Sequence, residues 1–396
     1  MLENKWIRAA IPALLIHSCI GSVYCWSLLK GDIADVIGCS VPSIEFAFSL
    51  AIFFLGMSAA FGGRFVEKNV KLASGVSCLF FVSGLILSIC AMRLKDANLL
   101  LMGYGCVMGV GLGIGYLSPV KTLMLWFSEH KGLATGIAIS GFGLSKVIFS
   151  PFIEWCNSAY GVELTLAYMA LISTVCMITA TLLIHKPKHW KEPKTPFNIK
   201  EYYRIVKNPT YLKIWFVFYM NITCGLALIS FEKSIALGLG ITNVALLASC
   251  TAFFNTAGRF GYSTFSDFTD SKELIYKVIF WTSMTFVGAA AGFYLAVPVI
   301  AMLMVVNAGY GGGFSTLPTL LQSKFGMDKI SMIHGLALSA WAWAGLSGNQ
   351  LSNLIVNTFG FDYKILLIVL AFLYFLSLCI TYTISPQKFN SVKFGN

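Results

Sequence analysis

The sequence predicts an all-α integral membrane protein with twelve transmembrane helices, arranged as two pseudo-symmetric six-helix bundles with both termini cytoplasmic. Hydrophobic residues make up 57% of the 396 residues and charged residues only 11%, and the mean hydropathy is +0.77. Soluble domains carry roughly 25% charged residues, so apolar runs that recur along the whole chain indicate a polytopic membrane protein. Eleven scattered cysteines without a Cys-x-x-Cys pair predict neither a metal site nor a disulfide framework.

Twelve apolar segments are long enough to cross a bilayer as helices. The first follows the short start MLENKWIR, and we expect it to stay as a helix rather than be cleaved as a signal peptide. In chain order the predicted spans are 8–30, 42–62, 72–92, 98–120, 132–154, 163–184, 211–231, 244–265, 274–294, 297–320, 332–355 and 363–384.

Lysine and arginine residues are distributed unevenly between the loops. An even number of spans places both termini on one side, and that side carries 21 of the 28 Lys and Arg residues, against five on the other. The positive-inside rule makes the richer side the cytoplasm, in the plasma membrane or the inner membrane of a bacterium. The net charge of +11 is then a sign of topology and of attraction to anionic lipid, and we expect no nucleic-acid partner.

The longest polar stretch, 185–209, is basic, contains four prolines, and divides the spans six and six. It predicts an N-terminal bundle at 1–184, a cytoplasmic linker at 185–210 and a C-terminal bundle at 211–396. Three patterns recur in order about 200 residues apart: 63–67 with 263–267, Gly115 and Pro119 with Gly313 and Pro318, and 131–134 with 334–337. This self-similarity favours a duplicated bundle of the kind that transporters use.

Arg259 lies inside the span 241–266, and no other charged side chain occurs between Lys233 and Asp267. A charge at this depth costs at least about 3 kcal/mol and is rarely kept without a function. A guanidinium stays protonated, and its planar fork matches a carboxylate or a phosphate. The competing interpretation is an arginine that pairs with a buried acid of the protein. The acids nearest to the spans map to their outer ends, so Arg259 instead predicts an anion-binding site. These acids are Glu45, Glu154, Glu163 and Glu232.

The block GVGLGIGYLSPVKTLMLWFSEHKGLATGIAISGFGLSKVIFSP, residues 109–151, resembles the major facilitator superfamily, and within it the oxalate:formate antiporter family, relatives of the monocarboxylate transporters. Further matching pieces are Tyr24-Cys-Trp-Ser27, Gly258-Arg259 with Ser266-Asp267, 309–314 with Pro318, and 334–337. The resemblance covers about the whole chain except the termini and the central loop. It implies twelve helices, alternating access, and a carboxylate substrate in a cavity between the halves.

The resemblance also implies a cytoplasmic gating element. The superfamily pattern is a glycine, an acid four residues later and then basic residues, which here are Gly63, Glu67, Lys68 and Lys71. The glycine permits close helix approach, and the acid can pair with basic groups or with a helix N-terminus, which favours an outward-facing state. The alternative is an ordinary charged loop. Glu67 replaces the usual Asp, and the second copy keeps Asp267 but has Ser263 for the glycine.

Arg259 matches the family's substrate-binding arginine, and Asn255, one turn earlier on the same face, is expected to position it. Family members that carry the dicarboxylate oxalate use a second cation, a lysine on helix eleven, which aligns here with Trp341. A second carboxylate would then be buried unpaired, which favours a monocarboxylate. Lys146 leaves an alternative open: it is either a second cation that restores dicarboxylate binding or a side chain that snorkels to the outer surface.

Aromatic side chains are expected to line the cavity. They lie on spans one, four, ten and eleven, and ordinary helix packing is the competing interpretation for each ring. The predicted lining residues are Tyr24, Trp26, Tyr116, Tyr310, Phe314, Trp341 and Trp343.

The sequence therefore predicts a secondary carrier for a small carboxylate such as formate, lactate or pyruvate, working as an antiporter or a proton symporter. Its expected partners are the substrate, protons and the lipid bilayer, with no cofactor and a monomeric chain. The motifs His-Glu-x-x-His and Gly-x-Ser-x-Gly are missing from the sequence, which argues against an enzyme. The alternatives are a dicarboxylate exchanger that uses Lys146, an organophosphate or other anion carrier, a drug exporter, and a transport-dead sensor.

Overall fold

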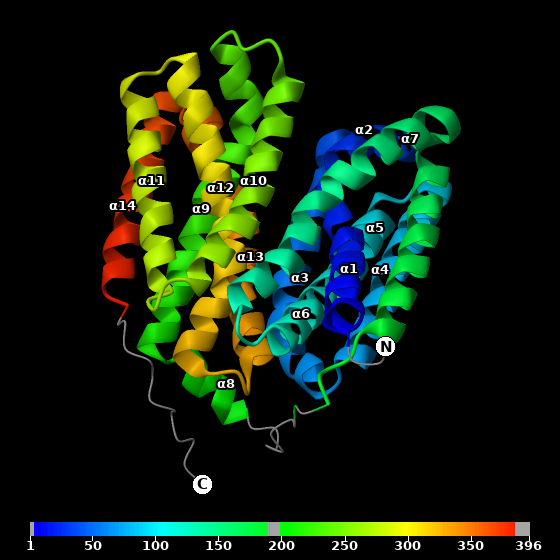
Figure 1. Cartoon of the computed structure of the whole chain (residues 1–396). Helices are drawn as coiled ribbons and strands as arrows, with labels where there is room; N and C mark the ends of the chain where they lie inside the picture. Colours follow the sequence, from blue (N-terminus) through cyan, green and yellow to red (C-terminus); the bar gives the residue numbers. More distant parts are fainter. Residues whose placement is uncertain (1–3, 189, 191–198, 385–396) are drawn as a thin grey trace. The chain divides into compact units, whose positions relative to one another are not determined.

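The computed structural model describes residues 4–188, 190 and 199–384, and every regular element in these residues is helical (Figure 1). The chain forms two compact units. The first unit comprises Met1–Pro193 and Asp328–Ala342, and the second comprises Lys194–Met327 and Trp343–Asn396. The predicted boundaries at 184 and 211 stay a prediction, while the segment Asp328–Ala342 clusters with the first unit.

The first unit contains the helices α1 to α7 and the first half of α13. Helix α1 packs against α7, α3 packs against α6, and α4 packs against both α6 and α7. The bounds are η1 Trp6–Ala10, α1 Ile11–Gly21, η2 Ser22–Cys25, α2 Trp26–Ile37, α3 Val41–Lys68, α4 Val70–Leu94, α5 Ala97–Leu100, η3 Leu101–Val107, α6 Met108–Trp126 and α7 Lys131–Leu183.

Glycines on α6 explain why this helix packs so closely on two neighbours. A Cβ at Gly113 would lie 2.8 Å from the amide nitrogen of Ala59 on α3. A Cβ at Gly111 would lie 3.0 Å from the Cα of Phe81 on α4. The two glycines point at different helices, so the glycine-dense sequence of α6 lets it sit between α3 and α4.

The second unit contains α8 to α12, the rest of α13, and α14. Helix α10 packs against α12, α11 packs against α12 and α14, and α9 packs against α12 and α14. The bounds are α8 Ile199–Val206, α9 Pro209–Gly238, α10 Val244–Asp267, α11 Glu273–Gly292, α12 Ala296–Phe325, α13 Ile330–Asn353, η4 Leu354–Thr358 and α14 Tyr363–Tyr382.

Side-chain caps fix the starts of several helices. The Asn208 side chain accepts from the backbone N–H groups of Thr210 and Tyr211, and Pro209 occupies the first turn of α9, where its missing N–H costs nothing. Asn243 caps α10 in the same way. The two asparagines fix the residues at which α9 and α10 begin. The start of α10, and with it the position of Arg259 along that helix, is therefore set by the local sequence.

Nine helices among the described residues are long and apolar enough to cross a membrane. One of them, α7, spans 53 residues and turns sharply at Gly161, whose φ of +81° is left-handed and favours glycine. The predicted spans 132–154 and 163–184 both lie on α7. The predicted spans 244–265 and 332–355 lie on α10 and on α13 with η4, which fall outside those nine. Every predicted span therefore lies on helical elements, while the twelve crossings and the orientation of the termini stay predictions.

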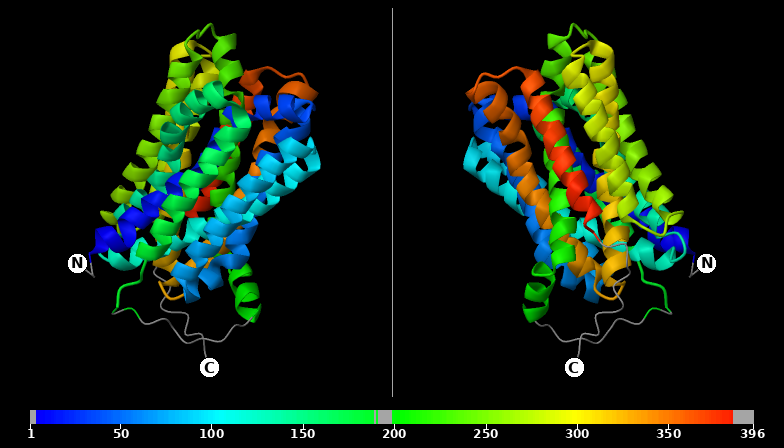
Figure 2. Two further views of the ribbon diagram at one scale, coloured as in Figure 1. Left: turned by 90° about the vertical axis from the view of Figure 1, so that its right-hand side faces the viewer. Right: turned by 90° about the vertical axis from the view of Figure 1, so that its left-hand side faces the viewer.

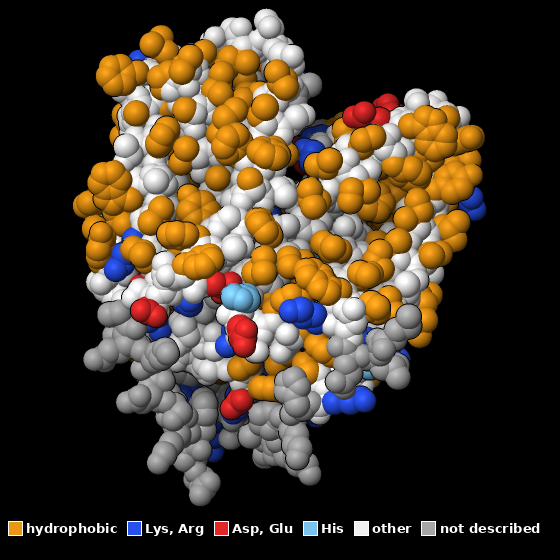
Figure 3. Space-filling model, in the orientation of Figure 1, with side chains coloured by type: hydrophobic (Ala, Val, Ile, Leu, Met, Phe, Trp, Pro, Cys, Tyr) orange, Lys and Arg blue, Asp and Glu red, His pale blue; other side chains and the backbone are white. Residues whose placement is uncertain are grey.

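The outer surfaces of the helices are apolar. Large hydrophobic side chains remain exposed along them, for example Phe61 at 72% and Val297 at 77%. Figure 3 shows hydrophobic side chains over the length of the helices and charged ones gathered near helix ends. The side views in Figure 2 show the long helices running beside one another within each unit. This distribution is the one that a lipid environment requires.

Candidate functional site

Arg259 lies in the interior of α10, and its side chain is almost fully buried, at 1% exposure. Its Nε donates a 2.9 Å hydrogen bond to Oδ1 of Asn255, one helical turn earlier. Its guanidinium carbon lies 5.4 Å from the ring centre of Phe314 on α12, a cation–π arrangement. Because Asn255 accepts from Nε, it helps to orient the plane of the guanidinium.

Glycines bring α10 and α12 into contact around Arg259. A Cβ at Gly311 would collide with the carbonyl oxygen of Asn255 and would lie 3.0 Å from the Cγ of Arg259. A Cβ at Gly258 would lie 2.7 Å from the carbonyl carbon of Ala308. The close approach of the two backbones is therefore what places the guanidinium over Phe314.

The aromatic residues predicted on α12 are buried beside Arg259 in the second unit. The rings of Tyr310 and Phe314 lie 5.2 Å apart, and Phe218 of α9 lies 5.1 Å from Phe314. Asn221, also on α9 and 1% exposed, directs its amide at the carbonyl oxygen of Tyr310 at 3.5 Å. The sequence analysis missed Phe218 and Asn221, although a lone Asn within a predicted span is itself a signal.

A second aromatic cluster forms within the first unit around Phe142 of α7. Tyr24, Tyr116 and Trp341 lie 5.2, 5.8 and 5.8 Å from the Phe142 ring, and Tyr116 and Trp341 are 5.7 Å apart. Tyr116 and Trp341 are both buried. The structure thus brings together three of the predicted rings, and it adds Phe142, which the sequence analysis did not single out.

The two remaining predicted tryptophans lie elsewhere. Trp26, at the start of α2, packs against Tyr104 of η3 with ring centres 4.4 Å apart. Trp343 on α13 is 51% exposed. The part of both rings in a binding site stays a prediction.

Lys146 lies half-buried on α7. It is one helical turn from Phe142, which contacts Tyr24, and one turn from Ser150, whose hydroxyl lies 3.8 Å from the thiol of Cys25. Residues four apart share a helix face, so Lys146 lies on the face of α7 that packs on η2. Within the described part of the chain it makes no hydrogen bond or ion pair. Its role stays open.

His17 is a buried polar residue that the sequence analysis missed. It lies on α1 with 0% exposure, and its two ring nitrogens approach two backbone carbonyl oxygens, Nδ1 that of Ala138 on α7 and Nε2 that of Tyr116 on α6, the latter at 3.1 Å. The sequence analysis surveyed the predicted spans for acids, lysines and arginines. A histidine in the middle of the first span was the available signal.

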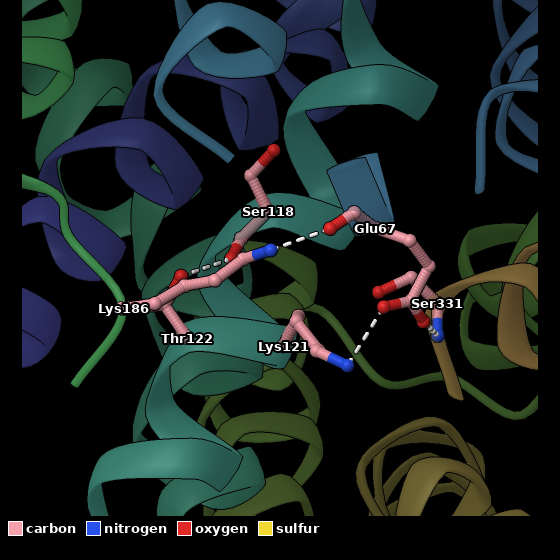
Figure 4. Close-up of polar contacts among 6 residues, drawn as sticks. All are labelled: Glu67, Ser118, Lys121, Thr122, Lys186 and Ser331. Atoms are coloured by element: carbon pink, nitrogen blue, oxygen red, sulfur yellow. Dashed lines mark hydrogen bonds and ion pairs between the residues drawn. The ribbon is translucent and has the colours of Figure 1, made fainter. Parts of the chain in front are cut away.

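The residues of the predicted gating element include Glu67, which lies at the C-terminal end of α3 and makes contacts with several segments (Figure 4). One carboxylate oxygen pairs with Lys121 Nζ at 2.7 Å, and the other accepts from the backbone N–H of Ser331 at 2.6 Å. Ser331 lies in the first turn of α13, so Glu67 sits at a helix N-terminus, where a negative charge is stabilised. Lys186 donates to the backbone carbonyl of Glu67 at 2.5 Å.

Close packing accompanies this contact, since a Cβ at Gly63 would lie 2.7 Å from the Cα of Met332. Lys68 and Lys71, the basic residues of the sequence pattern, are exposed. The cations that reach Glu67 come instead from α6 and from the linker, at separations of 54 and 119 residues. A local motif could not identify them.

The second unit holds its own buried ion pair near Asp267, the acid of the second pattern. Lys324 and Glu273 are 3.2 Å apart with side-chain exposures of 3% and 1%. Glu273 opens α11, so the positive end of that helix also favours its carboxylate. Asp267 itself, at the end of α10, is only partly buried. Glu273, six residues after Asp267, is the acid of this buried pair, and the gating role of Asp267 stays a prediction.

Comparison with known proteins places these features in context. Residues 13–349 match the family model of the Major Facilitator Superfamily. The chain is 25% identical to an oxalate:formate antiporter of Oxalobacter formigenes, over 99% of this chain and 94% of that one. It is 21% identical to apicoplast pyruvate carrier 1 of Toxoplasma gondii, over 91% and 86% of the two chains.

Among solved structures, the Major Facilitator Superfamily transporter FucP in the outward conformation superposes with a TM-score of 0.74. That likeness covers 95% of this chain and 98% of that one at 14% identity. At this level of identity the likeness concerns the fold alone.

Proposed function

Because the chain belongs to the Major Facilitator Superfamily and is a multi-pass integral membrane protein, we propose that it is a secondary transporter of small carboxylate anions, with Arg259 as the anion-binding group. The observation that carries the proposal is the buried guanidinium, oriented by Asn255 and Phe314. At 4 Å and an effective dielectric constant near 20, one cation–anion contact is worth about 4 kcal/mol before desolvation.

A monocarboxylate is the favoured substrate. Members of the oxalate:formate antiporter family that carry oxalate have a lysine at the position that aligns with Trp341. In this chain the side chain at that position is an indole, packed between Tyr116 and Phe142. A second carboxylate would have to leave water without a matching charge there, which costs several kcal/mol. The relatives include both an oxalate:formate antiporter and a pyruvate carrier, and short monocarboxylates are common to those names.

The proposed mechanism is alternating access. A bound anion neutralises Arg259 and so lowers the cost of enclosing the site away from water, because a lone buried charge is expensive. An empty, charged site should reorient more slowly than a loaded one, so exchange of one anion for another should be faster than net uptake. The binding of the anion thus drives the conformational change. This mechanism requires no cofactor.

Counterflow in proteoliposomes tests the proposal. Vesicles loaded with unlabelled pyruvate should take up labelled pyruvate transiently above its external concentration, while formate and lactate compete and oxalate competes weakly. Inorganic phosphate and a hexose phosphate test the alternative, a carrier for organophosphates or other anions. Vigorous exchange of phosphate without exchange of any carboxylate would reject the carboxylate assignment.

Gly311→Ala should impair this exchange strongly, because its methyl group would collide with the Asn255 carbonyl and press on Arg259. Overpacking costs about 1–3 kcal/mol, and we expect roughly tenfold weaker substrate competition. Gly288→Ala is the matched control on α11, because a Cβ there meets no atom within 4 Å. Equal exchange by the two variants would show that α10 and α12 tolerate separation at this point.

Dicarboxylate exchange through Lys146 is the second candidate, and the half-buried position of Lys146 on the face of α7 that meets η2 favours it. If the favoured monocarboxylate proposal is right, Lys146→Ala should leave pyruvate counterflow within about twofold, since a snorkelling lysine contributes little energy. Selective loss of oxalate exchange in Lys146→Ala, with pyruvate exchange retained, would instead assign the second cation to Lys146. Lys30→Ala, which removes an outer-surface lysine on α2, is the control for surface charge.

A further inference from the structure

His17 sits in a site that suits a charged imidazole. Both of its ring nitrogens face backbone carbonyl oxygens, Ala138 on one side and Tyr116 on the other. A carbonyl oxygen accepts hydrogen bonds and cannot donate one. A neutral imidazole has a single N–H, so in that form one nitrogen directs its lone pair at the lone pairs of an oxygen. Only the doubly protonated ring satisfies both contacts.

Burial opposes this preference. His17 has 0% exposure, and an ion removed from water is penalised. The two carbonyl contacts favour the cation, and the burial favours the neutral ring. A group held between two such opposing effects changes its protonation when water or a counter-charge gains or loses access to it. That behaviour is required of a site that takes up a proton on one side of a membrane and releases it on the other.

The surroundings of His17 contain other titratable groups. Tyr116 lies 5.2 Å from the His17 ring and 6.0 Å from the ring of His334 on α13, so its phenol ring neighbours both imidazoles. On α6 the next charged residue is Lys121, which is paired with Glu67, and on α7 the charged residues on either side of Ala138 are Lys131 and Lys146. Phe142 covers the remaining edge of His17 at 6.3 Å.

His334 provides a contrast in the same unit. It is also buried, at 1% exposure, but its Nε2 has no hydrogen-bond partner among the described residues. Nothing at that nitrogen offsets the cost of a positive charge. The two histidines thus share burial and a neighbour, Tyr116, and differ in whether acceptors are present at both nitrogens.

The geometry points to His17 as the binding site for a proton that is transported together with the carboxylate anion. The inference rests on the proposed function and deepens it by naming the coupled ion and the residue that holds it. One proton binds to the neutral imidazole and forms the imidazolium when the anion is bound, and both are released on the other side. One monoanion and one proton carry no net charge, so the cycle is electroneutral.

The test compares gradient-driven accumulation with exchange in the same proteoliposomes. A gradient of one pH unit, acid outside, is imposed with the membrane potential held at zero by potassium and valinomycin, and labelled pyruvate is followed with protein-free vesicles as background. Wild-type protein should accumulate pyruvate about tenfold, because one pH unit is a tenfold ratio for one proton. His17→Gln should show no accumulation but should retain counterflow at uniform pH, because glutamine can donate to one carbonyl and cannot bind a proton.

His334→Gln is the matched control and should accumulate pyruvate like the wild type. The inference is overturned if His17→Gln still accumulates pyruvate about tenfold, if His334→Gln alone loses accumulation, or if the wild type exchanges pyruvate without responding to the gradient. In this last case the carboxylate proposal stands and only the proton site falls. A wild type that shows no counterflow at all overturns both.

A spectroscopic readout covers the case in which His17→Gln does not fold. The chain has five histidines, and replacing His130, His185, His189 and His334 by glutamine leaves His17 as the only one. Nitrogen-15 NMR of histidine-labelled protein in lipid then reports the ring directly. With pyruvate present and the medium acidic, we expect a ring that carries protons on both nitrogens. A single neutral tautomer under these conditions would refute the assignment.

Discussion

Arg259→Gln is expected to abolish saturable carboxylate exchange. The substitution keeps a polar but shorter side chain and removes the charge, and with it a contact worth about 4 kcal/mol before desolvation at an effective dielectric constant near 20. Since 1.4 kcal/mol corresponds to a factor of ten in affinity, the loss is at most roughly a thousandfold, because desolvation offsets part of this contact. Pyruvate counterflow in proteoliposomes, with a competition series for affinity, measures it. The variant should stay folded, because losing a buried charge relieves a desolvation cost.

Two further variants separate charge from geometry. Arg259→Lys keeps the charge and loses the planar fork, so exchange should survive at reduced affinity and with poorer discrimination among planar anions. Asn255→Ala removes the 2.9 Å hydrogen bond to Nε and should weaken exchange less than Arg259→Gln, since the charge remains. Wild-type exchange by a correctly folded Arg259→Gln would remove the basis for the proposed binding site.

Lys121→Met is expected to cause the largest loss of stability. Its ammonium, 1% exposed, pairs with the 10% exposed side chain of Glu67 at 2.7 Å. Removing one partner of a buried pair takes the counter-charge away from the other, which costs about 3–5 kcal/mol. The first turn of α13 also depends on Glu67, through the N–H of Ser331. The midpoint of thermal unfolding in detergent should fall by at least about 5 °C.

Two control variants show whether the loss of stability comes from the buried charge. The double variant Lys121→Met/Glu67→Gln should regain most of the loss, because it removes both charges and the glutamine oxygen still accepts from Ser331. Lys30→Met breaks the exposed pair with Glu45, whose side chains are 31% and 57% accessible, and should change stability by less than about 1 kcal/mol. A Lys121→Met protein as stable as Lys30→Met would mean that water reaches the Glu67 carboxylate.

Local sequence was sufficient to locate the helices and the buried cation. The predicted spans lie on helical elements, because length and hydropathy are properties of contiguous residues and the bilayer sets the length. The placement of Arg259 inside α10, with Asn255 one turn away, follows from helical periodicity alone. The sharp turn of α7 at Gly161 also lies between two predicted spans.

Contacts between distant segments were beyond local reasoning. Glu67 follows a recognisable pattern, yet its partners Lys121, Lys186 and Ser331 come from residues 54 to 264 positions away. Trp26 and Trp341 are both tryptophans in predicted spans, and hydropathy and periodicity do not distinguish them. Only helix packing places Trp341 beside Phe142 and Trp26 beside Tyr104. His17 acquires its two acceptors from α6 and α7 together. Hydropathy and periodicity can be read from contiguous residues, so they predict helices. A polar site depends on which backbone atoms other helices bring within hydrogen-bond distance, and contiguous residues do not contain that information.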